Sequence, residues 1–269
     1  MTSLKLSKLD PAKQVAPGSI ITLVGKRNTG KTQCILNLMF ELRNKIELCI
    51  CMTPTRSSAQ AFAKVMPRCL IFDELRLDVI ERLMDIQSEI AAAKRRVRSV
   101  LLVLDDTSWE AKAFRTPSPI LARLYRNGRH LRISVICVLQ DCMDYHVGLR
   151  GQVDVLMCLR EVSLQMRKRL HSSWFGLLSL AEFNAVMDTV TERYGVLCLL
   201  NTVPSNTPAE VLYWWRAKLS LPPFRVVSDV YYFLAQHPEL APKEDKRNQP
   251  RREGCIQVET CGGSTVVSA

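Results

Sequence analysis

The sequence predicts an α/β fold in which a mostly parallel central sheet carries helices on both faces. Short apolar segments of strand length alternate along the chain with segments whose apolar residues recur at helical spacing. The strand segments are continuously apolar, which is typical of strands covered on both faces of a parallel sheet. The first of them leads into a glycine-rich loop and then a helical segment, an order that accompanies phosphate binding in this fold class.

Seven segments have the length and composition of buried strands, and four have helical periodicity. The expected strands are residues 19–24, 46–52, 68–72, 100–104, 133–139, 153–159 and 194–200. The expected helices are residues 33–42, 75–98, 163–193 and 226–235. The apolar residues expected to face the core in the second helix are Val79, Leu83, Ile86 and Ile90.

The chain is expected to form one domain, residues 1–241, followed by a tail, residues 242–269. A length of 269 residues and a hydrophobic content of 47% suffice for one large α/β domain. From about Pro242 the sequence is polar and charged with glycine and serine, so we expect a disordered tail. No apolar run approaches the ~20 residues that span a bilayer, and the N-terminus has no apolar signal core. We therefore expect an intracellular, soluble protein without a membrane span.

The net charge of the chain indicates the class of its partner, and the spacing of its cysteines argues against a zinc site or disulfides. A net charge of +11 favours a polyanionic partner, of which nucleic acid is the foremost, over a basic surface with no specific partner. The chain has ten cysteines, but no two are spaced C-x-x-C, and several lie inside apolar strand segments. We expect most of them to be small buried side chains rather than zinc ligands or disulfide partners.

The glycine-rich loop, Gly25–Thr32, reads GKRNTGKT and matches the phosphate-binding pattern G-x-x-x-x-G-K-[ST]. Its backbone is expected to wrap the phosphates, with the N–H groups at the helix start pointing at the anion. Lys31 is expected to reach the β- and γ-phosphates, and the Thr32 hydroxyl to ligate Mg²⁺. The residues expected to contact a nucleoside triphosphate are Gly25, Lys26, Arg27, Asn28, Thr29, Gly30, Lys31, Thr32 and Gln33.

An apolar strand segment, residues 100–104, ends in two acids, Asp105 and Asp106. This is the form of a Walker B element, in which a buried strand delivers carboxylates to the edge of the sheet. Asp105 is expected to hold the Mg²⁺ shell opposite Thr32, and Asp106 to polarise the attacking water. Neighbouring side chains on a strand face opposite ways, so the two acids are expected to differ in role.

Two further features suggest catalytic groups. Gln140 ends the strand that follows Asp106 in the sequence, where its amide would contact the γ-phosphate or the attacking water, or would simply be satisfied at a strand end. Arg129 follows Asn127-Gly128, which we expect to end a helix and leave the arginine on an exposed turn. Arg129 or Arg150 is a candidate arginine finger acting in a neighbouring subunit, or alternatively a surface cation or a contact to DNA phosphate.

Taken together, these motifs resemble those of the genome-packaging ATPases of large double-stranded DNA viruses, the poxvirus-type branch of the FtsK–HerA superfamily. The matching segments are residues 25–32, 52–55, 101–106, 127–130, 133–140 and 149–154. The resemblance covers residues 15–203. The phosphate loop and the acidic strand are generic, whereas the Gly-Arg-His turn before a strand that ends in Gln is more particular to this group.

The resemblance implies a RecA-like P-loop domain that assembles into a homo-oligomeric ring and uses ATP and Mg²⁺ to drive double-stranded DNA into a capsid. It implies that Lys31, Asp105, Asp106 and Gln140 are catalytic and that Arg129 or Arg150 acts in trans. DNA would be held through its backbone without base readout, and a capsid or portal component would be a partner. By resemblance, the protein acts at virion assembly sites in the infected cell. One departure is that motors of this superfamily often carry Glu where this chain has Asp106.

Three other functions were weighed. A nucleotide-gated switch would need a guanine-selecting Asn-Lys-x-Asp, and the nearest string, residues 44–47, ends in Glu and lies too close to the phosphate loop. A small-molecule kinase is a less good match to the basic charge and to the long separation of the loop from Asp105. An inactive DNA-binding scaffold is disfavoured because Lys31, Thr32 and Asp105 are all present.

Overall fold

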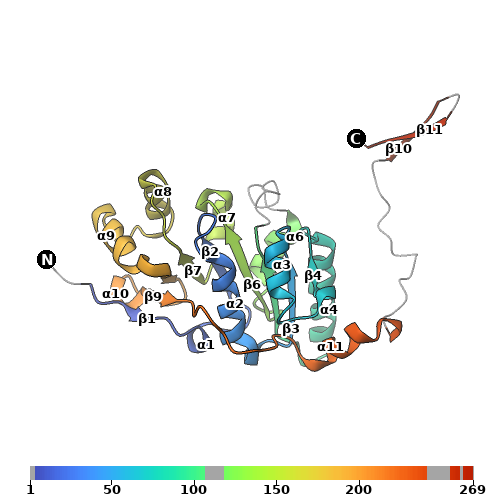
Figure 1. The fold of residues 1–269 in the computed structure, drawn as a ribbon, viewed down its shortest axis with the longest axis horizontal. Helices are drawn as coiled ribbons and strands as arrows, with labels where there is room; N and C mark the ends of the chain where they lie inside the picture. The colour runs from blue at the N-terminus through green and yellow to red at the C-terminus, as the bar shows by residue number, and fades with distance from the viewer. Residues whose placement is uncertain (1–3, 107–117, 241–254, 261–262, 269) are drawn as a thin grey trace. The chain divides into compact units, whose positions relative to one another are not determined.

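The computed structural model describes residues 4–106, 118–240, 255–260 and 263–268. The chain divides into a unit of residues 1–235 and a unit of residues 236–269, and each is described by itself. In the described part of the first unit, nine strands form one sheet (Figure 1). They are β1 (Ser7–Lys8), β2 (Ile20–Val24), β3 (Leu48–Met52), β4 (Ile71–Phe72), β5 (Val100–Leu104), β6 (Ile133–Leu139), β7 (Val155–Cys158), β8 (Gly195–Leu200) and β9 (Leu212–Arg216).

The sheet is mostly parallel, as predicted. Its strand order is β1-β9-β8-β7-β2-β6-β5-β3-β4, and the pairs from β7 to β4 are all parallel. Only β8 runs antiparallel to its neighbours β7 and β9. All seven predicted strands are present, although the segment at 68–72 pairs only through Ile71 and Phe72 because residues 68–70 form a 3₁₀ turn. β1 and β9 were not predicted from the sequence.

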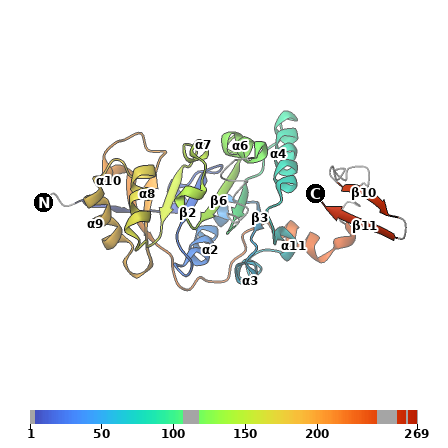
Figure 2. The same cartoon turned by 90° about the horizontal axis from the view of Figure 1, so that it is seen from above.

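Helices cover both faces of the sheet, as Figure 2 shows from above. They are α1 (Pro11–Gln14), α2 (Lys31–Leu42), α3 (Arg56–Phe62), α4 (Leu77–Ala92), α6 (Pro119–Asn127), α7 (Val147–Arg150), α8 (Leu164–Trp174), α9 (Leu180–Val190), α10 (Pro208–Val211) and α11 (Asp229–Gln236). One apolar core contains residues of α2 and α3, and a second contains residues of α4, α6, α8 and α9. The described helices include none with the length and apolar character needed to cross a bilayer.

Three of the predicted helices differ from the observed ones. The helix predicted at 75–98 ends at Ala92, because Lys94 adopts a left-handed backbone with φ 54° that a helix does not continue through. Its buried face is also rotated from the predicted one, since Ile80, Leu83 and Met84 are buried whereas Ile86 is 39% exposed.

The helix predicted at 163–193 is in fact two helices, α8 and α9. A new helix begins after Ser179, whose hydroxyl accepts from the backbone N–H of Glu182 while the Glu182 carboxylate accepts from the Ser179 N–H. This reciprocal capping box fixes a helix start inside a segment whose apolar spacing looked continuous. The helix predicted at 226–235 is displaced by a few residues and is α11.

The second unit contains a two-stranded antiparallel hairpin, β10 (Cys255–Thr260) and β11 (Gly263–Ser268). These two strands were not predicted from the sequence, which indicated a disordered tail here. The rest of the predicted disordered tail, residues 242–254, 261–262 and 269, lies outside the described residues, so disorder there stays a prediction.

The cysteines of the first unit lie mostly in the core, as predicted. Seven are buried, namely Cys34, Cys49, Cys51, Cys137, Cys142, Cys158 and Cys198. Burial raises the pKa of the Cys34, Cys137 and Cys142 thiols to about 12. These side chains are therefore neutral thiols at physiological pH and act as small apolar groups.

A testable consequence of the fold concerns Gly18, which precedes β2. Its φ is +87°, and a Cβ there would lie 2.8 Å from the Cα of Arg129. We expect Gly18→Ala to lower the free energy of unfolding by about 2 kcal/mol or more, because it adds left-handed strain and a backbone clash. Chemical denaturation in urea measures the change.

Gly151→Ala is the matched control. Gly151 has φ −66°, and no atom lies within 4 Å of the position that its Cβ would take. This substitution should alter the free energy of unfolding by less than about 1 kcal/mol and in the stabilising direction. Equal losses for both variants would contradict the assigned backbone at Gly18.

Candidate active site

The phosphate loop connects β2 to α2 at the carboxyl edge of the sheet (Figure 1). The Gly25 N–H donates to the Leu139 carbonyl at 3.0 Å, which extends the pairing of β2 with β6 into the loop. Within the loop, the Thr29 hydroxyl and the Lys31 ammonium both donate to the Lys26 carbonyl, at 2.7 and 2.8 Å. The loop is thus folded around one backbone oxygen.

The first turn of α2 is suited to an anion. Gly30 is its N-cap residue and has no side chain that could accept from the N–H groups of the first turn. Those N–H groups have no partner within the helix and carry its positive dipole end, so they favour an external acceptor such as phosphate. The side chain of the loop residue Lys26 reaches beyond the loop, where its ammonium pairs at 2.7 Å with the buried carboxylate of Glu161, a residue that follows β7.

Lys31 lies close to the two acids at the end of β5. Its side chain is half-buried, and this burial lowers the pKa of the ammonium below its ordinary value. The carboxylates of Asp106 and Asp105 act in the opposite direction and raise that pKa, in that order of size. The fold therefore brings together the loop lysine and the acidic pair, which are more than 70 residues apart in the sequence.

Asp105 is buried, with 2% of its surface exposed. Its Oδ2 accepts from the Thr53 hydroxyl at 3.2 Å, and the Ser58 hydroxyl also hydrogen-bonds to the carboxylate. Burial is the largest effect on this group and raises the pKa of the carboxyl above its ordinary value, while the two hydroxyl hydrogen bonds lower it. The carboxylate is held in a site that is costly for its charge when no cation is bound.

Asp106 contacts different groups. Its backbone is left-handed, with φ 55°, and its side chain is half-buried. The Gln140 amide donates to Asp106 Oδ1 at 2.6 Å, and the Thr55 hydroxyl lies 3.5 Å from Oδ2. The second acid and the strand-end glutamine are therefore hydrogen-bonded to each other at the edge shared by β5 and β6.

The oxygen atoms around Asp105 suit a magnesium ion. Thr32 Oγ1 lies 3.2 Å from Ser58 Oγ, and Ser58 in turn bonds to Asp105. Hydroxyl and carboxylate oxygens are the ligands that Mg²⁺ prefers, and it usually keeps several waters besides one or two carboxylates. Among the described residues no group of three or more His, Cys, Asp and Glu side chains is arranged to hold a metal. The Thr32 and Asp105 pair thus fits a partly hydrated magnesium ion.

Three residues of the site were not chosen from the sequence: Thr53, Thr55 and Ser58. They come from the segment after β3 and the first helical turns of α3, because β3 lies beside β5 in the sheet. A signal was present, since hydroxyl residues follow the predicted second strand just as acids follow the fourth. Carboxyl ends of parallel strands meet at one edge, which makes such residues candidates for the same site.

The two candidate arginine fingers have different surroundings. Arg129 forms an ion pair with Asp154, whose other oxygen accepts from the Ile20 N–H at 2.8 Å. That position is the amino end of β2, the opposite edge from the phosphate loop. Arg150 donates to the Tyr145 carbonyl at 3.0 Å and to the Ser173 hydroxyl at 3.1 Å. Its guanidinium also lies 3.8 Å from the sulfur of Met143, a residue that follows closely after Gln140 in the sequence.

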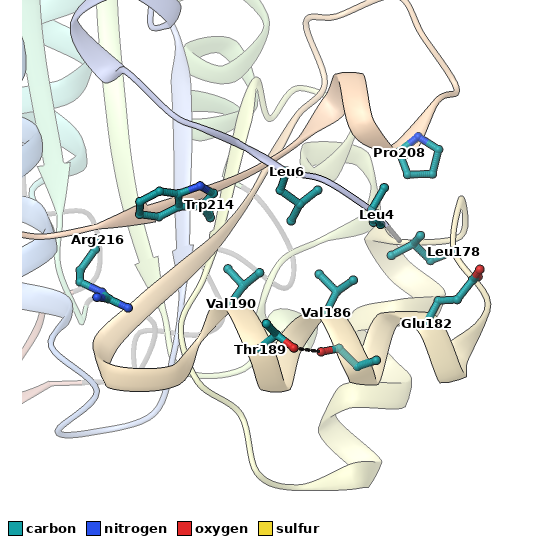
Figure 3. Close-up of a pocket in the computed structure, with 11 residues that line it drawn as sticks. Leu4, Leu6, Leu178, Glu182, Val186, Thr189, Val190, Pro208, Trp214 and Arg216 are labelled. Atoms are coloured by element: carbon teal, nitrogen blue, oxygen red, sulfur yellow. Dashed lines mark hydrogen bonds between the residues drawn. The ribbon is translucent and has the colours of Figure 1, made fainter. Parts of the chain in front are cut away.

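An apolar groove of about 650 Å³ lies away from these groups, between α9 and the N-terminal segment (Figure 3). Leu4 and Leu6 face Val186 and Val190 across it, and Trp214 of β9 closes one side. None of the acids of the candidate active site lines this groove.

The burial of Asp105 leads to a prediction about stability. Its carboxyl pKa is raised in the folded protein, so the associated stability is present at low pH and is lost as the pH rises through the folded-state pKa. At neutral pH we therefore expect Asp105→Asn to raise the Tm of the nucleotide-free protein, because it removes a buried charge and keeps an oxygen that accepts from Thr53. Thermal unfolding at pH 7.5, without nucleotide, measures the shift.

Asp106→Asn is the control for that experiment, because Asn is also tolerated in the left-handed conformation and the side chain is less buried. It should change the Tm less than Asp105→Asn. A lower Tm for Asp105→Asn than for the unmodified chain would show that the carboxylate is stabilising where it lies.

Similar solved structures have the same fold. The genome packaging NTPase B204 of Sulfolobus turreted icosahedral virus 2, in complex with AMPPCP, superposes with a TM-score of 0.52 at 16% identity, covering 76% of this chain and 100% of that one. The conjugation coupling protein TcpA of pCW3, with ATPγS, gives a TM-score of 0.51 at 12% identity and covers 85% of this chain and 65% of that one. The predicted P-loop NTPase fold is thereby confirmed.

Sequence relatives occur in viruses. Uncharacterized protein 088R of Invertebrate iridescent virus 3 is 28% identical over 230 residues, which cover 80% of this chain and 86% of the relative. Uncharacterized protein 015R of Frog virus 3 is 24% identical over 204 residues, covering 76% and 63%. The family model described as "Poxvirus A32 protein" matches residues 13–218, which include the phosphate loop, both acids and Gln140. This match extends over more than half of the sequence, so the chain belongs to the poxvirus A32 protein family.

Proposed function

We propose that this chain is an ATPase that drives double-stranded DNA into a viral capsid. The observation that carries the proposal is the meeting of Lys31 with Asp105 and Asp106 at one edge of the sheet, where Gln140 is bound to the second acid. Membership of the A32 family supports it, as does the likeness of the fold to that of B204, which is described as a genome packaging NTPase.

In this proposal the loop binds ATP through Lys31 and the N–H groups at the start of α2. The ammonium of Lys31, which now donates to the Lys26 carbonyl, turns to the β- and γ-phosphates. Thr32 and Asp105 would hold Mg²⁺, which would supply charge neutralisation at the phosphates. Ser58 and Thr53 orient the Asp105 carboxylate through their hydroxyls.

Hydrolysis requires a water placed in line with the γ-phosphate. Asp106 and Gln140 are the candidates for orienting this water. The Gln140 amide donates to the Asp106 carboxylate, and both side chains keep further oxygen atoms that can accept a hydrogen bond. We assign to Asp106 the polarisation of the attacking water, and to Gln140 the role of sensing the γ-phosphate through its contact with Asp106.

An arginine from a neighbouring subunit would stabilise the charge that develops on the phosphates. Of the two candidates we propose Arg150, since Arg129 is paired with Asp154 at the opposite edge of the sheet from the phosphate loop. Arg150 extends from α7, which follows Gln140 and the short 3₁₀ turn Cys142–Asp144. This role in trans implies a homo-oligomeric ring.

The net charge of the chain and its membership of the A32 family suggest which partners it binds. A net charge of +11 suits a DNA backbone, so we propose contacts to phosphate without base readout. A capsid or portal component would anchor the ring at the virion assembly site of the infected cell.

The first test is ATP turnover by the purified full chain, with and without linear duplex DNA. We expect DNA to stimulate turnover, and Lys31→Ala to reduce it by at least a hundredfold, because the lysine contacts the transferred phosphate. Lys64→Ala, at an exposed lysine after the end of α3, is the control and should leave turnover unchanged.

Other results would point elsewhere. Nucleotide binding with turnover that DNA does not alter would favour a nucleotide-gated switch, and phosphate transfer to a small molecule would favour a kinase. Turnover that survives Lys31→Ala would remove the loop from the mechanism.

A second test addresses Arg150. Arg150→Ala should lower turnover at saturating ATP, and a mixture of Arg150→Ala with Lys31→Ala subunits should recover part of it, since each supplies what the other lacks at a shared site. Arg129→Ala serves as the comparison, and we expect its mixture with Lys31→Ala to show no such recovery. If the Arg150→Ala mixture stays inactive while mixed oligomers form, Arg150 does not act in trans.

A further inference from the structure

The turn between α9 and β8 contains two residues with an unfavourable, left-handed backbone conformation. Arg193 and Tyr194 are both left-handed, with φ 50° and 61°, which is rare for a residue with a side chain and rarer still for two in succession. The chain doubles back so closely that a Cβ on Gly195 would lie 1.8 Å from the Val190 carbonyl. Strained positions of this kind concentrate at functional sites.

Contacts on both sides hold the turn in this shape. The buried Thr191 donates from its N–H and its hydroxyl to the Met187 carbonyl, at 3.0 and 2.6 Å. The Arg216 guanidinium, which also borders the groove in Figure 3, donates to the Glu192 carbonyl at 3.2 Å. In spite of these anchors, Tyr194 stays 67% exposed. The turn therefore presents an aromatic side chain instead of burying it.

The exposed ring lies against the phosphate loop. Its Cδ1 is 3.8 Å from the position that a Cβ would take on Gly30, immediately before Lys31. Because β8 is antiparallel to β7, its first residue lies at the edge where β7 ends, which is also the edge of the phosphate loop. Tyr194 is thus at the correct edge of the sheet for a loop-bound nucleotide.

The position of the Tyr194 ring relative to Asp105 and Asp106 indicates which end of a bound nucleotide the ring would face. In the sheet, β2 lies between β6 and β7, with β5 beyond β6 and β8 beyond β7. Asp106 and Gln140 are on the β5 and β6 side, so the γ-phosphate end of a bound nucleotide points that way. The base end then lies on the β7 and β8 side, where Tyr194 is.

We propose that the base of the bound nucleotide stacks on the ring of Tyr194. The inference rests on the proposed function, in which the loop of residues 25–32 binds ATP. An exposed aromatic face offers stacking to any base, because every base has a π face, and it does not read the base edge.

The test compares two probes on the full chain: ATP, and inorganic tripolyphosphate, which has the phosphates but no base. Tyr194→Ala should weaken ATP binding about tenfold or more, the loss typical of one base–aromatic stack. It should leave tripolyphosphate binding unchanged. Tyr194→Phe keeps the ring and should bind ATP as the unmodified chain does. Isothermal titration measures all of these affinities, each in the presence of Mg²⁺.

The outcomes separate this inference from the proposed function. If Tyr194→Ala weakens ATP and tripolyphosphate binding equally, the residue only shapes the loop, and stacking is wrong. If it changes neither, the base lies elsewhere. Lys31→Ala tests the loop itself: retained binding of both probes by that variant would refute nucleotide binding at the loop, whatever Tyr194 does.

Discussion

The candidate active site depends on the register of three parallel strands. Val24 of β2 is opposite Leu139 of β6, and Leu104 of β5 is opposite Cys137 of the same strand. As a result the phosphate loop, Gln140 and the acidic pair all begin where these strands end. A shift of one residue in any pairing would turn each side chain to the other face of the sheet and separate these groups.

Burial disfavours the charged forms of two groups in the resulting site, the Asp105 carboxylate and the Lys31 ammonium. Asp105 is buried and hydrogen-bonded to two hydroxyl groups, while Lys31 is itself partly desolvated and directed to a backbone carbonyl. Each of these groups gains from a ligand of opposite charge, Mg²⁺ in one case and phosphate in the other. Under the proposed function, metal and nucleotide together would relieve a cost built into the folded chain, which is a common way for a site to favour its ligand.

Much of this could be predicted from the sequence because the signals are local. The strand, loop and helix around Lys31, and the acids after residues 100–104, are each read from a few consecutive residues. The missed features are tertiary. The Arg129 pair with Asp154, and the hydroxyls of Thr53 and Ser58 on Asp105, depend on which strands are neighbours, and strand order is not encoded in any one segment.

Two missed strands and a missed helix break have their own causes. β9 carries a continuous apolar and aromatic run, Leu212–Trp215, which by the criterion used for the other strands indicates a strand, whereas β1 is only two exposed residues. The division of α8 from α9 depends on the cap at Ser179, a polar interaction that hydrophobic spacing does not report.

The left-handed backbone of Asp106 bears on which acid this position can carry. Short polar side chains such as Asp and Asn tolerate that region because they hydrogen-bond locally, whereas a longer side chain gains no such compensation. Glu, which the motor superfamily that the motifs resemble often carries here, has an extra methylene between backbone and carboxylate. In this chain, the bend after the strand brings the shorter acid to Gln140. The left-handed backbone directly after β5 therefore favours a short acid at this position.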